Sequence, residues 1–429
     1  MKNFAILIAA LLTVLVAGCL EEPPTSGPPG GAADAGFSGD AGGEDDGGET
    51  NGGEPDAGSD ADQLVEPDAD DTDAGDSGGW EDTGPVDPCD GVTCGANASC
   101  QGGTCSCATG YEGDPYAGCV APGPCGSEGC EYGAYCDQGL CRCKFGFTAT
   151  TDGCDRDGAP DPVTRSKQEV CDMWLGTTHP SAPMWEIEPE ETCDWGVLDS
   201  VYHNNAMTEL NLYRWLVGLE AMASQDNLRE TTQACATVLA GEGAGLTHFP
   251  DESYTCYTQQ GASGAGSSNI AMGTNAVGSV RLYIEDWNVP SLGHRRWAFN
   301  PRAVDTAFGA RGTYTCMYAF SSGGSHNPEF TAYPAPGYFP AGALAGKWSV
   351  ASSSWGLNDE VEIEILRLSD QEVIGTHSLT YHQADMLRPH MVSFRPVAPL
   401  TREVAHEVRI SNLNGSPSEQ TYTLTLTDC

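Results

Sequence analysis

The sequence predicts a multidomain fold: a disordered acidic linker, two small disulfide-bonded modules, an α+β domain and a C-terminal β-sandwich. Three observations lead to this class. The 429 residues carry 19 cysteines and a formal net charge of -42, twelve of the cysteines repeat one spacing, and the second half changes from helix-like to strand-like periodicity. A chain this acidic lacks the basic surface that nucleic acids require, so we exclude nucleic acid as a partner.

Residues 1–18 have the pattern of an export signal. A short positive start is followed by an apolar run from Phe4 to Val16, which is too short to span a membrane, and by two small residues. Val-Ala-Gly-Cys resembles a bacterial lipobox, which implies lipidation of Cys19; an ordinary signal peptide cut nearby is the alternative. Leu20 then favours sorting to the outer membrane. We expect an outer-membrane or cell-surface lipoprotein of the bacterial envelope, with outer-membrane lipid as the partner of its anchor.

Residues 19–88 are predicted to be a disordered linker. The segment is rich in Gly, Asp, Glu, Ala, Pro and Ser, and it has roughly twenty carboxylates and no Lys or Arg, so it cannot bury enough apolar surface to fold. It contains GDSGG at 75–79, a pentapeptide that surrounds the serine of trypsin-like proteases. A disordered strand supplies neither an oxyanion hole nor an oriented histidine, so no catalysis is expected there.

Two short segments of the chain repeat one cysteine pattern. In both, the gaps between cysteines are four, five, four and one residues, and the last gap is eleven or ten. Residues 89–119 and 125–154 therefore resemble EGF-like modules, which are too small to fold without disulfides. Calcium is unlikely on this pattern, because only Asp87 represents the acidic residues that precede calcium-binding modules. The resemblance implies these pairs: Cys89–Cys100, Cys94–Cys105, Cys107–Cys119, Cys125–Cys136, Cys130–Cys141 and Cys143–Cys154.

Six further cysteines allow fifteen connectivities, among which the sequence cannot choose. We expect Cys171–Cys193 to close residues 155–199 into a lead-in to the next domain. We also expect Cys235–Cys256 to fix the ends of the intervening loop. The last two cysteines, at 316 and 429, could then pair with each other.

Hydrophobic periodicity predicts the two larger domains. Apolar stripes at helical spacing indicate helices over 206–222, 228–243 and 277–288, and short β-rich pieces follow them. Helices that flank a small antiparallel sheet make residues 200–322 an α+β layered domain. Residues 333–429 contain strand-like pieces at short intervals and predict a β-sandwich of immunoglobulin-like kind.

Five motifs in order support a family resemblance: LNLYRWLVGL, ACATVLAGEGAGLTH, SSNIAMG, GHRRWAFNP and AFGARG. They resemble the CAP superfamily, also called the SCP domain, which includes cysteine-rich secretory proteins, antigen 5 and plant pathogenesis-related proteins. The resemblance covers residues 200–322 and implies an α-β-α sandwich. It also implies a cleft that in many members carries two histidines and two glutamates and in some binds zinc.

The motifs place the family's histidines at His248 and His294, which are the expected zinc ligands. Ser268 replaces the first glutamate, and the second matches Glu285 or Asp286 without a clean register. A hydrolytic zinc site usually has three protein ligands and a carboxylate base, so this set is incomplete. The expected ligand cleft comprises His248, Ser268, Asn269, Glu285 and His294.

These expectations favour a secreted, lipid-anchored CAP-domain protein that acts as a non-enzymatic binding module for a protein, glycan or lipid. A metal-dependent hydrolase with a degenerate His/His cleft and a structural envelope protein are the alternatives. The arginines of GHRR are expected to face carboxylates or solvent. Four other histidines belong to no recognisable constellation and are expected at the surface: His203, His377, His382 and His406.

Overall fold

The computed structural model describes residues 88–429 except 122, 124, 126–129, 160, 288 and 386. The described residues belong to one compact unit. The predicted signal peptide, the lipidation site Cys19, the acidic linker and its GDSGG segment lie outside the described residues. No helix in the described part of the chain is both long and apolar enough to cross a bilayer.

Two hairpin pairs build each of the two N-terminal disulfide modules. All six disulfides implied by the sequence resemblance are present there, with Cα atoms between 5.5 and 5.9 Å apart. Modules this short bury too little apolar surface to form a stable core, so the disulfides hold each module together. The strands are β1 (Ala98–Gln101), β2 (Thr104–Cys107), β3 (Glu112–Asp114), β4 (Gly118–Val120), β5 (Ala134–Asp137), β6 (Leu140–Cys143), β7 (Phe147–Thr150) and β8 (Gly153–Arg156).

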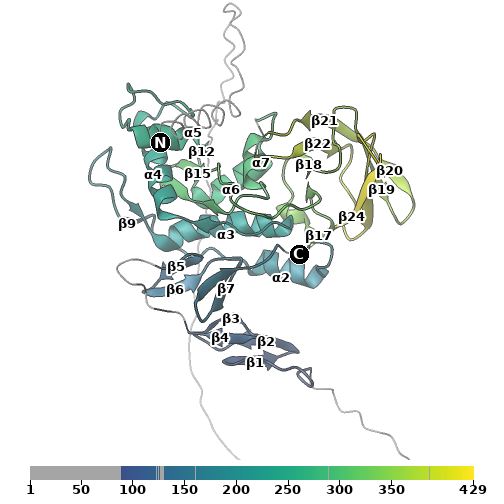
Figure 1. Ribbon diagram of the computed structural model, residues 1–429, viewed down its shortest axis with the longest axis horizontal. Coiled ribbons are helices and arrows are strands. Elements are labelled where there is room, and N and C mark those ends of the chain that lie inside the picture. Colours follow the sequence, from purple (N-terminus) through teal and green to yellow (C-terminus); the bar gives the residue numbers. More distant parts are fainter. Residues whose placement is uncertain are drawn as a thin grey trace, which may run out of the picture. The chain divides into compact units, whose positions relative to one another are not determined.

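A three-stranded antiparallel sheet with helices on both faces follows (Figure 1). Its central strand is β15, between β12 and β14. The predicted periodicities correspond to α3, α4 and α6, whereas α5 and α7 were not predicted. The elements are α3 (Ser200–Leu216), α4 (Asp226–Glu242), α5 (Gln259–Gly266), β12 (Ser268–Met272), α6 (Ala276–Glu285), α7 (Gly293–Ala298), β14 (Phe308–Arg311) and β15 (Tyr314–Tyr318).

Alternation along β15 separates the two helical layers. Cys316 packs in a cluster with residues of α4 and α5, while the next residue, Met317, packs with residues of α3 and α6. Successive side chains of a strand point to opposite faces, so each face receives its own pair of helices. The result is an α-β-α layering of this part of the chain. Short two-stranded pairs lie outside it: β9 (Trp185–Ile187) with β10 (Val197–Leu198), and β11 (Ala223–Ser224) with β13 (Asp305–Thr306).

Two sheets make up the C-terminal part, in the orders β16-β18-β22-β21 and β17-β24-β23-β19-β20. Residues of both sheets share one hydrophobic cluster with α3 and α6. The boundary predicted between 322 and 333 therefore does not separate two hydrophobic cores. The strands are β16 (Thr331–Tyr333), β17 (Gly337–Pro340), β18 (Trp348–Ser352), β19 (Glu362–Arg367), β20 (Glu372–Ile374), β21 (Thr376–His382), β22 (His390–Pro396), β23 (Ala405–Ser411) and β24 (Gln420–Thr427).

The long-range disulfides differ from the two pairs expected. Cys171–Cys193 and Cys235–Cys256 are wrong. Cys235 lies fully buried on the face of α4 that packs on β15, so the sulfur beside it belongs to that strand. A capping box at Ser166 starts a helix, α2 (Lys167–Gly176), where the sequence was interpreted as a closed loop, and this helix packs near β17. The pairs present are Cys171–Cys429, Cys193–Cys256 and Cys235–Cys316.

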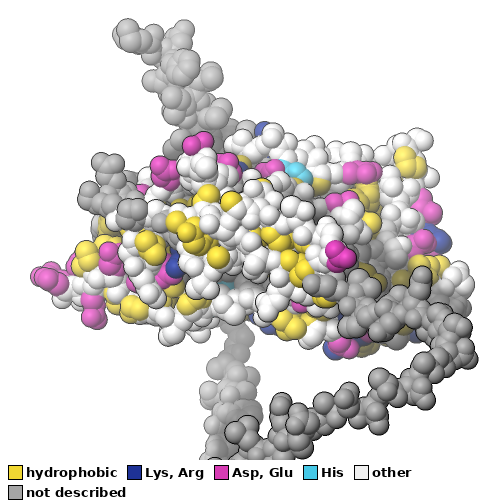
Figure 2. Space-filling model, turned by 90° about the horizontal axis from the view of Figure 1, so that it is seen from below, with side chains coloured by type: hydrophobic (Ala, Val, Ile, Leu, Met, Phe, Trp, Pro, Cys, Tyr) yellow, Lys and Arg dark blue, Asp and Glu magenta, His cyan; other side chains and the backbone are white. Residues whose placement is uncertain are grey.

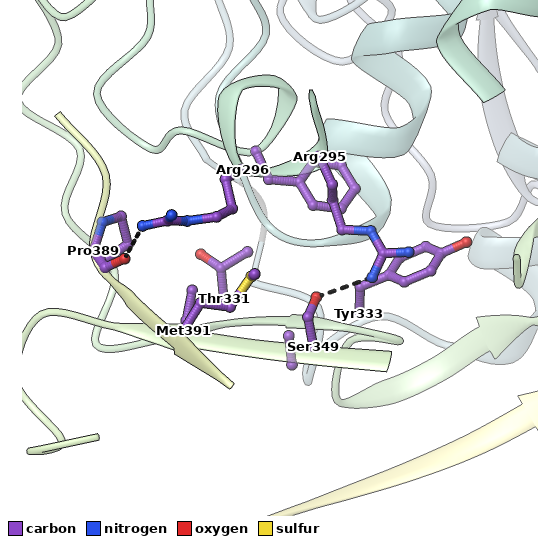
Figure 3. Close-up of a pocket in the computed structure, with 10 residues that line it drawn as sticks. Arg295, Arg296, Thr331, Tyr333, Ser349, Pro389 and Met391 are labelled. Carbon is purple, nitrogen blue, oxygen red and sulfur yellow. Dashed lines mark hydrogen bonds between the residues drawn. The ribbon is translucent and has the colours of Figure 1, made fainter. Parts of the chain in front are cut away.

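Arg295 joins α7 to the C-terminal sheets, contrary to the expectation that it faces carboxylates or solvent. It is 1 % exposed. Its guanidinium donates to the carbonyl oxygens of Ile284 (2.6 Å) and Lys347 (2.5 Å) and to Ser349 Oγ (3.3 Å), and it lies 4.7 Å from the ring centroid of Tyr333. Figure 3 shows this side chain pointing toward Ser349 and Tyr333 across a small cavity of about 20 Å³. The single planar guanidinium of Arg295 thus donates hydrogen bonds to backbone carbonyl oxygens of both parts of the chain.

Candidate functional site

The predicted cleft is centred on a histidine–carboxylate pair. His294 is the second residue of α7, and Asp286 ends α6 in a left-handed conformation with φ 52°. Their side chains meet with 2.7 Å between Nδ1 and Oδ1, and the other carboxylate oxygen accepts from the backbone N–H of Arg295 at 3.2 Å. The Asp286 side chain is only 1 % exposed. A carboxylate accepts only, so Nδ1 of His294 carries a proton and Nε2 of the neutral ring has a free lone pair.

Asp286, and not Glu285, is the acidic residue beside His294. Glu285 binds Arg281 Nε at 2.9 Å and accepts from Trp287 Nε1 at 2.7 Å, so its carboxylate is directed away from this pair. The left-handed backbone of Asp286, at the end of α6, turns the Asp286 side chain toward α7. The sequence left these two acids as alternatives, and the helix end decides between them.

His248 has the same arrangement of its ring nitrogens. Its Nδ1 donates to the carbonyl oxygen of Ala265 at 2.7 Å, which leaves Nε2 without that partner. Burial lowers the pKa of His248; the hydrogen bond to the Ala265 carbonyl opposes this shift, and the electrostatic effect of His294 adds to it. Each of the two predicted histidines therefore has Nδ1 engaged by an oxygen acceptor, which leaves Nε2 available.

Ser268 and Asn269 are adjacent on β12, and both are almost fully buried. Asn269 Nδ2 donates to the backbone carbonyl oxygen of His294 at 3.0 Å. The backbone carbonyl oxygen of Asn269 accepts from Tyr283 Oη at 3.1 Å. The Tyr283 ring lies 5.6 Å from the His294 ring, between centroids. Ser268 Oγ is buried with no hydrogen-bond partner among the residues that the structure describes. Asn269 therefore positions the α7 backbone, whereas the Ser268 hydroxyl makes no such contact with the described residues.

The donor set fits a metal ion only in part. Two imidazole Nε2 atoms oriented by a carboxylate and a carbonyl match the usual second shell of a zinc-bound histidine. Zinc prefers four ligands, of which catalytic sites take three from the protein. Within the described ranges, the single group of three possible ligands is Cys125, Cys130 and Cys141, whose sulfurs are oxidised in disulfides. The histidines could hold zinc through two protein bonds, with water completing the shell.

Exposed aromatic side chains follow both His248 and Asp286 in the sequence. Phe249 follows His248 and is 58 % exposed, and Trp287 follows Asp286 and is 62 % exposed. Large exposed aromatics next to a polar cleft are typical of contact surfaces. Figure 2 shows another face, on which Asp and Glu side chains are scattered among apolar ones and Lys and Arg are sparse.

The sequence missed three buried histidines. His203, His382 and His406 are at most 6 % exposed, although a surface position was expected, and only His377 of that group is exposed. Each buried ring has a hydrogen bond: His203 accepts from the Phe308 backbone, His382 contacts Ser393 Oγ and His406 contacts the Val404 carbonyl. A single polar residue in an amphipathic element gives no signal of such a local partner.

Comparison of the chain with protein-family models, with characterised proteins and with solved structures gives no match.

Proposed function

We propose that this chain is a lipid-anchored binding protein of the bacterial cell surface, with a CAP-like domain that follows two EGF-like modules. The order of the five sequence motifs, the α-β-α layering and the disulfide pattern of the two modules support this class. Its ligand is a protein, glycan or lipid that contacts the cleft between His248 and His294. The N-terminal sequence pattern, ending at Cys19, supports the anchor and the outer-membrane location.

One observation carries the non-enzymatic assignment: among the described residues of the cleft, no carboxylate is free to act as a base once both histidines are engaged through Nε2. Asp286 is buried and both its oxygens are already bound, by His294 and by the Arg295 backbone. Ser268 offers a hydroxyl where the family has a carboxylate. A hydrolytic site needs a base that can reach water or substrate. The arrangement is suited to holding a ligand through the two Nε2 atoms and the neighbouring aromatic rings.

A metal-dependent hydrolase is the second candidate, and the same pair favours it. A carboxylate that fixes the tautomer of a histidine is a feature of catalytic zinc sites. Under this alternative His248 and His294 are zinc ligands, and an exogenous group must provide the third bond.

Zinc titration by isothermal calorimetry separates the two candidates. We expect the full chain to bind zinc weakly, with affinity lost in His248→Ala and His294→Ala and reduced about tenfold or more in Asp286→Asn, because the outer carboxylate orients the ring. His377→Ala, which removes an exposed histidine, is the matched control.

The same proteins are then incubated with casein and with peptidoglycan, with zinc above its dissociation constant. The binding role predicts no turnover of either substrate. Tight zinc binding together with turnover that both histidine variants abolish would establish the hydrolase instead.

A further inference from the structure

A second hollow, separate from the cleft, lies where the second disulfide module meets the layered domain. It has a volume of about 670 Å³, and residues of β5, of the loop after β6 and of the first turns of α3 and α4 line it. The two parts are joined by direct hydrogen bonds: Asn211 Nδ2 to the Phe145 carbonyl at 3.3 Å, and Arg156 to the Val304 carbonyl at 2.8 Å. Its size is within the range of small-molecule sites.

Lys144 is the buried cation of this hollow. It follows β6, it is 6 % exposed, and it lines the hollow. No hydrogen bond or ion pair joins its ammonium to another residue in the described ranges. A lysine that is almost fully buried and has no charge partner is rare in proteins, because its charge loses much of its hydration.

Two more donors of the hollow are also unused. His203 Nε2 accepts from the Phe308 N–H at 3.1 Å, so the ring proton of the neutral histidine is on Nδ1. No hydrogen bond joins that Nδ1 to any residue that the structure describes. Ser224, from β11, has a buried hydroxyl that likewise finds no partner among the described residues. Lys144 and His203 therefore offer the hollow two donors without a partner in the described part of the chain, while the Ser224 hydroxyl lies beneath its surface.

Among the charged side chains that line the hollow, the cationic ones are less exposed than most of the acidic ones. Burial, and next the charge of Arg229, lower the pKa of Lys144 to about 8. Burial also holds the pKa of His203 well below its usual value, with Arg229 and Lys144 contributing. Asp199 accepts hydrogen bonds from the backbone N–H groups of Val201 and Tyr202 and so caps α3. The exposed acids that line the hollow are Glu131, Glu186 and Asp226.

We propose that this hollow binds a small ligand through an oxyanion group, a carboxylate, sulfate or phosphate, with Lys144 as its main charge partner. His203 Nδ1 supplies a further donor, and Arg229, which donates to the Leu198 carbonyl and lies 3.8 Å from an Asp226 oxygen, adds positive charge. Charge-assisted hydrogen bonds of this kind are stronger than neutral ones. The exposed acids favour a ligand whose other end is cationic or neutral. This site uses none of the residues of the His248 and His294 cleft, so it stands independently of the proposed function.

Isothermal calorimetry of the full chain with acetate, inorganic sulfate and inorganic phosphate, at constant ionic strength, tests the site. We expect saturable binding of at least one of the three anions. Lys144→Met should weaken it at least tenfold, and Lys144→Arg, which keeps the charge, should retain it. Lys167→Met is the matched control, because Lys167 is an exposed lysine that pairs with Glu403. The anion that binds most tightly identifies the oxyanion class.

Melting temperatures distinguish a variant that has lost the anion site from one that has failed to fold. In buffer without these anions, Lys144→Met should melt at a higher temperature than the native chain, because it removes an unpaired buried charge. Adding the preferred anion should raise the melting temperature of the native chain and leave that of Lys144→Met unchanged. The inference is overturned if none of the anions binds the native chain, or if Lys144→Met and Lys167→Met change the affinity equally.

Discussion

Arg295→Met should strongly destabilise the part of the chain that contains α7 and the C-terminal sheets. Methionine keeps the aliphatic stem and the burial but removes every donor. The carbonyls of Ile284, Ala345 and Lys347, which the guanidinium reaches at 2.6, 3.4 and 2.5 Å, then lose it as a donor. Each buried acceptor left unpaired costs about 1–3 kcal/mol, and relief from burying the charge offsets part of the sum. We expect a net loss of about 4 kcal/mol, a large share of the ~5–15 kcal/mol typical of whole domains.

Equilibrium urea unfolding followed by tryptophan fluorescence measures this loss. Arg302→Met is the matched control, because Arg302 is exposed and its guanidinium makes no hydrogen bond with any residue in the described ranges. Arg295→Lys keeps the charge but not the planar fork, so it should recover only a minor part of the stability. A loss below about 1 kcal/mol in Arg295→Met, or one equal to that of Arg302→Met, would refute the view that this guanidinium holds the two parts together.

Two further predictions concern acid stability and disulfide pairing. Burial, with the charges of Arg296, Lys347 and Arg295, lowers the pKa of His382 to about 4. A folded pKa below the unfolded value of about 6.5 means that stability is complete above pH 6.5 and is lost as the pH falls toward 4, by up to about 3 kcal/mol. His382→Gln should flatten that pH profile of unfolding, whereas His377→Gln, at an exposed position, should leave it steep. For pairing, non-reducing peptide mapping should link Cys235 to Cys316, and replacing both with alanine should cost about 4 kcal/mol for a closed loop of 81 residues. A peptide linking Cys235 to Cys256 would contradict the structure.

The sequence predicted local features far better than distant ones. The pairing of Cys89 to Cys154 that the resemblance to EGF-like modules implies is present, and each of these disulfides spans only 11 or 12 residues. Cys235 and Cys316 are 81 residues apart, and their pairing depends on which strand α4 covers. Periodicity identifies the inner face of a helix but not the element that packs on it.

The candidate site shows the same limit. Motif order located His248 and His294, but the acid beside His294 could not be chosen between Glu285 and Asp286. One residue of register at the end of a helix turns a side chain by about 100°, and the left-handed backbone that decides it depends on local packing. The burial of Lys144 and of His203 had no sequence signal, because Lys144 lies where the second disulfide module meets the layered domain and His203 packs against Phe308 of β14.

The shared hydrophobic core has a consequence for how such a chain can be rearranged in evolution. Each disulfide module carries its own three cross-links, and the near-identical spacing of the two is what duplication leaves behind. The first can be lost or exchanged more easily than the second, which packs Phe147 against Ala221 and Ala223 of the layered domain. The layered part and the C-terminal sheets bury apolar side chains against each other and are joined by Arg295. A crossover between residues 322 and 333 would expose both halves of that core, so these two parts are expected to be inherited together.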